Sequence, residues 1–452
     1  MKSVRTWACV YGLAMLAACG DDETQTPDPS AQGDTCEAGQ ETCEVTQNIT
    51  SDTTWTKDHT YVLKANVFVK NATLKIEPGT VIKGGFNTSL AITSTAKLDA
   101  QGTATAPIVF TSMVDVGSRQ AGNWGGLVLL GKAPLNVQGG VDNIEGYPES
   151  ADTQYGGSDA AHNCGTLKYA RIEFAGYRLG GNNELNGLTL GGCGTATTVD
   201  YVQVHRGLDD GVEMFGGTAN LKHIVVSLAD DDGLDWDQGW TGKGQFIVVQ
   251  QNRVVGNHGI EADNSSSSPN ATPRSNPTLW NVTLIGSNRD KGSAAQTQGG
   301  AILRVGTAGS LNNAIVAYFN DFAIDIAGPD SIREATEDRL TVKNTTFWST
   351  KLTYDATSFA VKSSSDGSDF NEWSKLGTQA EPTNTVVDPK LSKALYTAPS
   401  TATPNPVPDF KPETALAGGT PPADGFFDAS ATFRGAVGDT DWLAGWTAFP
   451  EL

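Results

Sequence analysis

Short stretches of alternating hydrophobic and polar residues recur over most of the chain. A first series of them is LKYARIEF (167–174), VDYVQV (199–204), LKHIVV (221–226), QFIVVQ (245–250), LWNVTL (279–284), LNNAIV (311–316) and VKNTTFW (342–348). Because side chains alternate between the two faces of a strand, each stretch predicts a half-buried β-strand. Many neighbours in the series are spaced about 22 to 32 residues apart, which is typical of a solenoid of stacked repeats.

A second series of short stretches follows the first. Its members are GVEMFGG (211–217), GLDWDQG (233–239), GIEADN (259–264), AILRVG (301–306) and FAIDIAG (322–328). Two or more short strands per repeat, with almost no helical periodicity, favour a parallel β-helix over leucine-rich or helical repeats. We therefore predict an all-β fold whose coils stack about 4.8 Å apart into a rod.

The first and last coils carry the most distinctive phrases. IEPGTVIKG (76–84), AKLDAQGTATAPIVFTS (96–112) and NWGGLVLLGKAPLN (123–136) resemble the opening coils of right-handed β-helix lipoproteins of Gram-negative bacteria. FRGAVGDTDWLAGWTAF (433–449) is similar to the closing segment of the same largely uncharacterised family. The resemblance extends over about residues 54–449. It implies a right-handed parallel β-helix solenoid with capping segments, and it implies no established activity.

The pattern divides the chain into four segments. We expect a lipoprotein signal peptide at 1–18, a flexible acidic tether at 19–53, the parallel β-helix at 54–365 and an irregular C-terminal wrap and cap at 366–452. A stack of coils exposes strand edges at both ends, which invites aggregation unless each end is covered. We expect the first segment after the tether to cap the lower end. Residues 366–452, with Trp442 and Trp446 as packing anchors, are expected to close the other.

The N-terminal residues are typical of a secretion signal and are not expected to be part of the fold. Lys2 and Arg5 precede an apolar stretch that ends in Leu-Ala-Ala-Cys, which resembles the bacterial lipobox. Cys19 is therefore the expected site of lipidation and the expected membrane anchor. The predicted location is the cell envelope, at the outer membrane, and the acidic residues after Cys19 resemble the surface-export signals of some lipoproteins. Simple solvation of the tether explains those acidic residues equally well.

The net charge of the chain limits the classes of molecule that it is expected to bind. The chain has 51 acidic and 31 basic residues, a net charge of −20 and a pI near 4.6. A basic face for nucleic acid is therefore not expected, and a cation or a neutral polymer is the better partner. The 38% hydrophobic content excludes a fully disordered chain and a multi-spanning membrane protein.

Four cysteines remain after the signal peptide and the lipidated Cys19: Cys36, Cys43, Cys164 and Cys193. An even number in an oxidising compartment predicts disulfides. Nearest-neighbour pairing joins Cys36 to Cys43 and Cys164 to Cys193, although four cysteines permit three connectivities. A metal site at these cysteines is disfavoured because no histidine lies at ligand spacing from them.

The most informative pattern is a series of carboxylates where the second set of strands begins. Aligning Gly211, Gly233 and Gly259 places Asp210, Asp232 and His258 in one column. The same alignment places Glu213, Asp235 and Glu261 in another column, with Val212, Leu234 and Ile260 pointing into the core. Like charges about 5 Å apart repel, so this acidic ladder requires a cation, protons or hydrogen-bond donors between its rungs.

Three interpretations of the acidic ladder stay open. In the first, the aspartates only accept backbone N–H groups at the corners of the coils. In the second, the carboxylates bind Ca²⁺, as a structural ion or as a bridge to an acidic polysaccharide. The expected ligands are Asp210, Glu213, Asp232, Asp235, Glu261 and Asp263.

In the third, a carboxylate pair serves a glycoside hydrolase or polysaccharide lyase. The hydrolase acid is Asp231 or Asp232, the base is Asp210 or Asp235, and His258 orients them. ADDDG followed by NHG is similar to motifs of β-helical polygalacturonases, but Asn257 replaces a glycine of that family and two further motifs are absent.

Basic and aromatic residues near the acidic ladder are weaker indications of function. A lyase needs a basic residue, for which Arg206, Lys243, Arg253 and Arg304 are the candidates, each also explained as a solvated rung. Trp236, Trp240 and Tyr177 are candidates for a sugar-stacking face, although such aromatics often pack under loops. The sequence thus predicts an envelope-anchored β-helix with a binding or structural role and Ca²⁺ as the expected cofactor, with a carbohydrate-active enzyme as the alternative.

Overall fold

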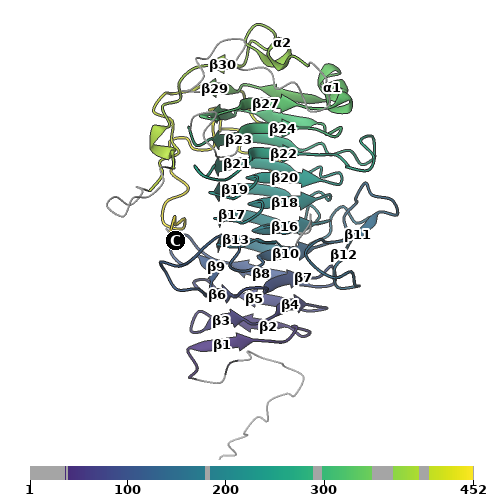
Figure 1. Cartoon of the computed structure of the whole chain (residues 1–452), viewed down its shortest axis with the longest axis vertical. Helices are drawn as coiled ribbons and strands as arrows, with labels where there is room; N and C mark the ends of the chain where they lie inside the picture. Colours follow the sequence, from purple (N-terminus) through teal and green to yellow (C-terminus); the bar gives the residue numbers. More distant parts are fainter. Residues whose placement is uncertain are drawn as a thin grey trace, which may run out of the picture.

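Parallel strands stack coil upon coil into an elongated β-helix in the computed structural model (Figure 1). The structure describes residues 36, 39–178, 184–288, 298–348, 370–396 and 407–450. Nearly all strand pairs are parallel, as a β-helix requires, and the predicted fold is confirmed. No helix in the described part of the chain is long and apolar enough to cross a membrane.

One face of the β-helix is a nine-stranded sheet of short strands. From the lower end upward it contains β4 (Asn66–Val69), β7 (Ser89–Ile92), β10 (Leu127–Leu130), β16 (Leu188–Gly191), β18 (Val212–Phe215), β20 (Leu234–Asp237), β22 (His258–Ala262), β24 (Gly299–Leu303) and β27 (Phe322–Ile326). Leu188, Val212, Leu234 and Ile260 are in register on successive coils. The side chains predicted to point inward do so, since Val212 and Leu234 are 0% exposed and Ile260 is 1% exposed.

The other faces form a larger sheet in which long strands replace pairs of short ones. In chain order its strands are β1 (Thr42–Val45), β2 (Thr53–Trp55), β3 (Thr60–Leu63), β5 (Thr73–Ile76), β6 (Val81–Gly84), β8 (Lys97–Gln101), β9 (Ile108–Ser112), β13 (Gly165–Glu173), β17 (Thr198–His205), β19 (Asn220–Ser227), β21 (Lys243–Gln250), β23 (Thr278–Ile285), β25 (Gly309–Asn312), β26 (Ile315–Ala317), β28 (Leu340–Lys343), β29 (Thr346–Trp348) and β30 (Thr385–Val386).

A left-handed residue bends each long strand and turns the chain from one face to the next. Tyr169, Tyr201, His223 and Phe246 hold this position on four successive coils, with φ between 47° and 61°. Their rings stack, with centroids 4.3 Å apart for Tyr169 and Tyr201 and 4.0 Å apart for Tyr201 and His223. This stacking offsets part of the cost of a backbone conformation that non-glycine residues seldom adopt.

Four short strands and two helices lie outside the coils. The hairpins are β11 (Val141–Asn143) with β12 (Gln154–Gly156), and β14 (Tyr177–Arg178) with β15 (Glu184–Leu185). At the upper end lie α1 (Pro329–Thr336) and α2 (Glu372–Leu376), whereas a 3₁₀ turn (Ser392–Ala394) lies beside the larger sheet, where Gln250 of β21 donates to the Ala394 carbonyl oxygen. Glu372 of α2 accepts a hydrogen bond from the backbone N–H of Ile326 in β27, 3.1 Å away. This contact fixes α2 against the last strand of the nine-stranded sheet.

The lower end of the β-helix begins earlier than the predicted boundary at residue 54. β1 pairs with β3 in parallel register, and its inward residues Cys43 and Val45 are buried. β2 pairs with β5 in the same way. The polar composition of residues 20–53 did not predict this coil. Only alternate residues of one short strand need to be apolar, so a coil can form in a mainly polar stretch.

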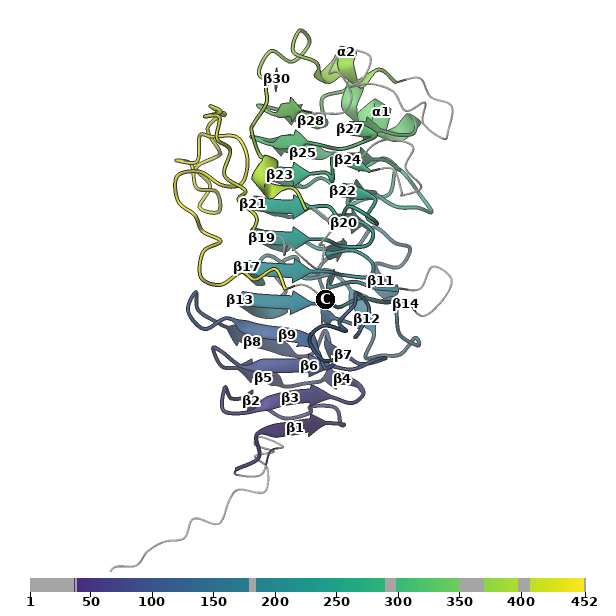
Figure 2. The same cartoon turned by 60° about the vertical axis from the view of Figure 1, so that its left-hand side comes forward.

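The C-terminal segment differs from the predicted end cap at 366–452. Residues 407–450, here called the strap, lie along the side of the larger sheet and run back toward β13 (Figure 2). Gln203 exchanges two hydrogen bonds with Ala448, and Thr283 accepts one from the backbone N–H of Ala436. In the preceding segment, α2 and β30 lie at the upper end (Figure 1), whereas Ala394 and Tyr396 lie further down, where they accept hydrogen bonds from Gln250 and Arg206.

The strap covers a second apolar cluster on the outside of the coils. This cluster joins Val225, Val248, Ile285 and Ile315 of the sheet to Phe410, Val437, Leu443 and Trp446 of the strap. Trp446 is 0% exposed and packs edge-on against Tyr169 and Tyr201, as expected for a packing anchor. A sheet with an apolar outer face requires such a cover.

Both predicted disulfides are confirmed in nearest-neighbour pairing. Cys36 is bonded to Cys43 and Cys164 to Cys193. The second bond is buried in the core, and it closes a loop that includes the residues between β13 and β16.

Candidate functional site

The acidic ladder forms as the alignment of glycines predicted. Glu213 in β18 is paired with Asp235 in β20, and Asp235 is paired with Glu261 in β22. Asp210, Asp232 and His258 lie at the corner where these strands begin, on the same three coils. The side chains of Glu213, Asp235 and Glu261 project from the outer surface of the nine-stranded sheet, because Val212, Leu234 and Ile260 directly before them fill the core.

Corner hydrogen bonds account for part of the ladder. The Asn186 side-chain oxygen accepts from the backbone N–H of Asp210 at 3.2 Å, and Asp210 Oδ1 accepts from the N–H of Asp232 at 2.9 Å. Asp232 Oδ1 accepts from the N–H of His258 in the same way. One oxygen of each aspartate therefore has the structural role of the first interpretation, while the second oxygen is not needed for it.

The acidic residues are far more buried than their outward direction suggests. Exposure is only 6% for Asp210, 8% for Glu213 and 4% for Asp232. The insert that carries β11 and β12 lies beside β16 and β18 (Figure 1). Gly146 of that insert packs on Leu185 of the β14–β15 hairpin. Water is thereby largely excluded from the carboxylates.

Three of these carboxylates converge on one point. Asp210, Glu213 and Asp235 each offer an oxygen within 4.8 Å of the others. Burial, and next the negative charge of Asp235, raise the pKa of Asp210 and of Glu213 well above the ordinary range. Burial and the charge of Glu261 do the same to the pKa of Asp235. We call these three residues the carboxylate trio.

Polar groups border the trio from the coil below. Asn186 Nδ2 donates to Glu213 Oε2. Thr189 is paired with Glu213 in the sheet, and its buried hydroxyl has no hydrogen-bond partner among the described residues. A buried hydroxyl without a partner beside buried carboxylates marks a position where an oxygen ligand is available.

A second group lies one coil higher and contains a histidine. His258 Nδ1 is 3.0 Å from Asp232 Oδ1 and 3.4 Å from Glu261 Oε2. Burial alone would lower the pKa of His258, but these two carboxylates outweigh it and raise that pKa to about 9. His258 is therefore a cation at neutral pH. Burial raises the pKa of Asp232 to about 7 against the opposing effect of His258.

Arg304 neutralises the upper end of the ladder. Its guanidinium binds Glu261, and its Nε donates to Asp263 Oδ1 at 2.9 Å. Burial would raise the pKa of Glu261, but His258 and Arg304 lower it. The six residues predicted as Ca²⁺ ligands thus divide into the carboxylate trio and a group whose negative charge Arg304 and His258 partly compensate.

Two acidic residues of this site were missed in the sequence. Glu145 from the insert and Glu184 from β15 both face Asp209. Burial, then hydrogen bonding and charge from Glu184, raise the pKa of Asp209 to about 9. Nothing in the sequence near Glu145 repeats the ladder pattern, and Glu184 lies outside the positions that the glycine alignment compared. Asn186 was also missed, although Asn186-Gly187-Leu188 aligns with Asp210-Gly211-Val212 and marks the coil below.

The predicted sugar-stacking face is wrong for two of its three aromatics. Trp236 is 3% exposed and Trp240 is 0% exposed, and both lie in the core. Their indole N–H groups donate to Thr307 Oγ1 and to the Ala219 carbonyl oxygen. Tyr177 is half-buried and lies edge-on to Phe86, with ring centroids 4.9 Å apart.

Two of the basic candidates for a lyase lie away from the acidic ladder. Arg206 donates to the hydroxyl of Tyr396, and Lys243 pairs with Asp424 of the strap at 2.6 Å, both on the larger sheet. Arg253 lies in the connection between β21 and β22, where it is exposed. Arg304 is at the ladder, but its carboxylate partners raise its pKa further, which makes it unsuitable as a base.

Comparison with known families agrees with the architecture. Residues 47–386 match the family described as a pectate-lyase-like β-helix domain, and the chain belongs to this family. The match extends from the first coils to β30. Neither the curated proteins nor the solved structures contain a match to this chain.

The buried carboxylates predict an unusual pH dependence for the metal-free protein. Folding raises the pKa of Asp232 to about 7 and that of Asp209 to about 9, both from an ordinary value of 3.8. The folded state then binds more protons than the unfolded state between about pH 4 and pH 9. We expect the melting temperature in excess chelator to fall as pH rises across this window.

Asp209→Asn should flatten the upper part of that curve, because the amide cannot ionise. Glu337→Asn, on the exposed end of α1, is the control and should leave the curve unchanged. A chelated protein whose melting temperature rises between pH 5 and pH 9 contradicts this account.

Proposed function

We propose that the chain binds Ca²⁺ at the carboxylate trio of Asp210, Glu213 and Asp235. The observation that carries the proposal is the convergence of three buried carboxylate oxygens within 4.8 Å. Such a group is stable at neutral pH only when protons or a cation compensate its charge. Ca²⁺ takes six to eight oxygen ligands in flexible geometry, and carboxylates are its usual ligands in proteins.

The remaining predicted ligands have a different place in the proposal. His258 and Arg304 compensate part of the negative charge of Asp232, Glu261 and Asp263, so these residues need a further cation less than the trio does. They border the trio and raise the negative potential at its upper side. Asn186 and the Thr189 hydroxyl border it from below.

We propose that the bound ion serves a glycan-binding role in the cell envelope. A chain with a net charge of −20 repels an acidic polysaccharide unless a cation lies between them. The family description names pectate lyase, which supports a uronate-containing polymer as the ligand. Ca²⁺ bound at the trio would offset the negative charge of this face and so weaken the repulsion between the two anionic partners.

The calcium site is tested by calorimetry and by thermal melts with and without EDTA. We expect one tight site per chain and a higher melting temperature in Ca²⁺, because the ion binds the folded state. Asp235→Asn should weaken binding at least tenfold. Asp263→Asn is the matched control, since Asp263 is held by Arg304, and should change the affinity less than threefold. Absence of binding heat and of any melting shift would refute the calcium site.

A carbohydrate-active enzyme is the second candidate function. Asp232, with a pKa of about 7, and Glu261, with a lowered pKa, flank His258 on adjacent coils. Paired carboxyl groups whose pKa values are driven apart are the usual equipment of acid–base catalysis. In this function Asp232 is the acid and His258 orients it.

A panel of acidic and neutral polysaccharides separates the two functions. Binding in Ca²⁺ that is lost in EDTA, with no new reducing ends and no unsaturated products, is expected for the binding protein. Products that disappear in Asp232→Asn but persist in Asp263→Asn would establish the enzyme instead. A panel with neither binding nor products contradicts both functions.

We also propose that Cys19 is lipidated and anchors the chain to the outer membrane. The lipobox-like sequence before Cys19 supports this, and Cys19 lies outside the described residues. We expect the protein to partition into the detergent phase when expressed in a Gram-negative host. Cys19→Ser should move it to the aqueous phase, and an unchanged partition would exclude the anchor.

A further inference from the structure

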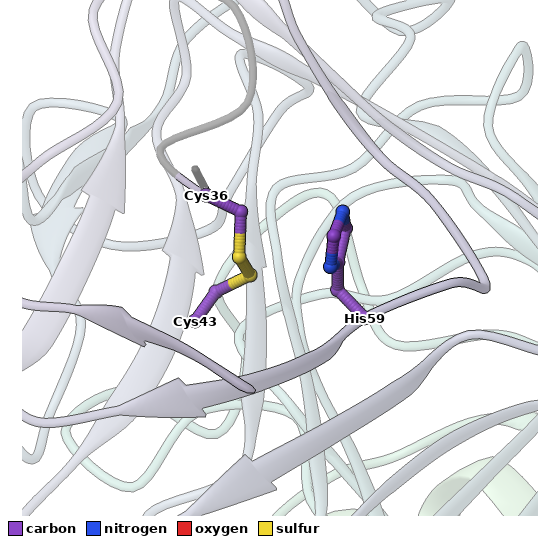
Figure 3. A group of neighbouring side chains, drawn as sticks. All are labelled: Cys36, Cys43 and His59. Atoms are coloured by element: carbon purple, nitrogen blue, oxygen red, sulfur yellow. A yellow bond between two sulfur atoms is a disulfide. The ribbon is translucent and has the colours of Figure 1, made fainter. Parts of the chain in front are cut away.

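A histidine lies beside the Cys36–Cys43 disulfide at the lower end of the β-helix (Figure 3). Cys43 is in β1 and is 2% exposed, whereas Cys36 and His59 are half-buried. The two sulfurs and one ring nitrogen of His59 lie within 4.8 Å of one another. This group is at the lower end of the rod, several coils below the acidic ladder (Figure 1).

Strand pairing explains why His59 lies there. β1 and β3 are parallel with Thr42 opposite Thr60, and the N–H of Thr60 donates to the Glu41 carbonyl oxygen at 2.9 Å. His59, which immediately precedes β3, is thereby brought beside Gln40 and close to both cysteines. The Gln40 carbonyl oxygen lies 2.5 Å from His59 Nδ1, and Tyr61 packs edge-on to the ring.

These contacts hold the imidazole in the way that metal-binding histidines are held. A histidine that binds a metal through one ring nitrogen commonly donates its other N–H to a backbone carbonyl, which fixes the ring. The Gln40 carbonyl oxygen offers that acceptor. Two cysteine sulfurs and one imidazole are also the donor set of many three-ligand zinc sites.

We propose that reduction of the Cys36–Cys43 disulfide converts this group into a Zn²⁺ site with Cys36, Cys43 and His59 as ligands. A dithiol reductant gives the disulfide two electrons and two protons, forming two thiols while the reductant becomes a disulfide. Zn²⁺ then displaces the two thiol protons and binds two thiolates and the neutral imidazole. A water molecule completes the tetrahedron.

The oxidised and the zinc-bound states exclude each other because they use the same two sulfurs. Each state ties the segment that enters β1 to the base of the β-helix, by a covalent bond or through the ion. Bound Zn²⁺ therefore opposes reoxidation by withdrawing both thiolates. The site also differs in selectivity from the carboxylate trio, since sulfur donors favour Zn²⁺ and an all-oxygen site favours Ca²⁺.

The test uses the full chain with Co²⁺ as the spectroscopic probe for Zn²⁺. A phosphine reductant replaces the dithiol, because it contributes no thiol ligand of its own. We expect thiolate-to-cobalt charge-transfer absorption and tetrahedral visible bands, at one Co²⁺ per chain, only after reduction. Added Zn²⁺ should bleach these bands, and Ca²⁺ should not.

Variants separate this site from other thiols. His59→Ala should weaken Co²⁺ binding at least tenfold, and Cys36→Ser should remove most of the charge-transfer band. The double variant Cys164→Ser and Cys193→Ser, which lacks the buried disulfide, should retain the full signal. Far-UV circular dichroism verifies that each variant keeps its β-structure, and Cys43→Ser replaces Cys36→Ser if the latter does not fold.

A reduced chain without thiolate–cobalt absorption would overturn the proposal. So would an affinity that His59→Ala leaves unchanged, because the sulfurs alone would then explain the binding.

Discussion

Backbone hydrogen bonding between successive coils is the constraint on which the rest of this structure depends. Parallel pairing in the nine-stranded sheet aligns Val212, Leu234 and Ile260, and it does so one coil spacing, about 4.8 Å, at a time. Any residue type that repeats in the sequence is therefore stacked upon itself in space. Stacked rings at the left-handed corners are favourable, whereas stacked carboxylates are not. The same pairing thus produces a stabilising column and a column that needs a counter-charge.

Cover from outside the coils decides how strongly the carboxylates interact. The insert and the β14–β15 hairpin exclude water from Asp210 and Glu213, and a lower local dielectric strengthens the repulsion between them. Where the chain supplies its own cations, as Arg304 and His258 do for Glu261, the pKa of the carboxyl group is lowered instead. One continuous ladder therefore contains two electrically different halves, which meet on the coil that carries Asp232 and Asp235.

The register within the ladder was predictable because glycines mark the same corner in each coil, so aligning Gly211 with Gly233 and Gly259 also aligned the acids. The cover over the ladder was not predictable, because Glu145 and Glu184 reach Asp209 from the insert and from the β14–β15 hairpin, which do not follow the repeat of the coils. Spacing along the chain misled in one case, since His59 is far from ligand spacing yet parallel pairing of β1 with β3 brings it to Cys43. The burial of Trp236 and Trp240 was not predictable either, because it depends on three-dimensional packing and not on how many aromatic residues lie nearby in the sequence.

The strap gives this rod a property that a simple stack of coils lacks. In a solenoid each coil contacts only its neighbours, so coils can separate from one end at a local cost. The strap touches Thr345 near the upper end through Arg434 and Gln203 near the middle through Ala448. Fraying of an upper coil therefore also breaks contacts that hold the middle coils. Cooperative unfolding over many coils, and resistance to peeling under an axial pull, follow from this single tie.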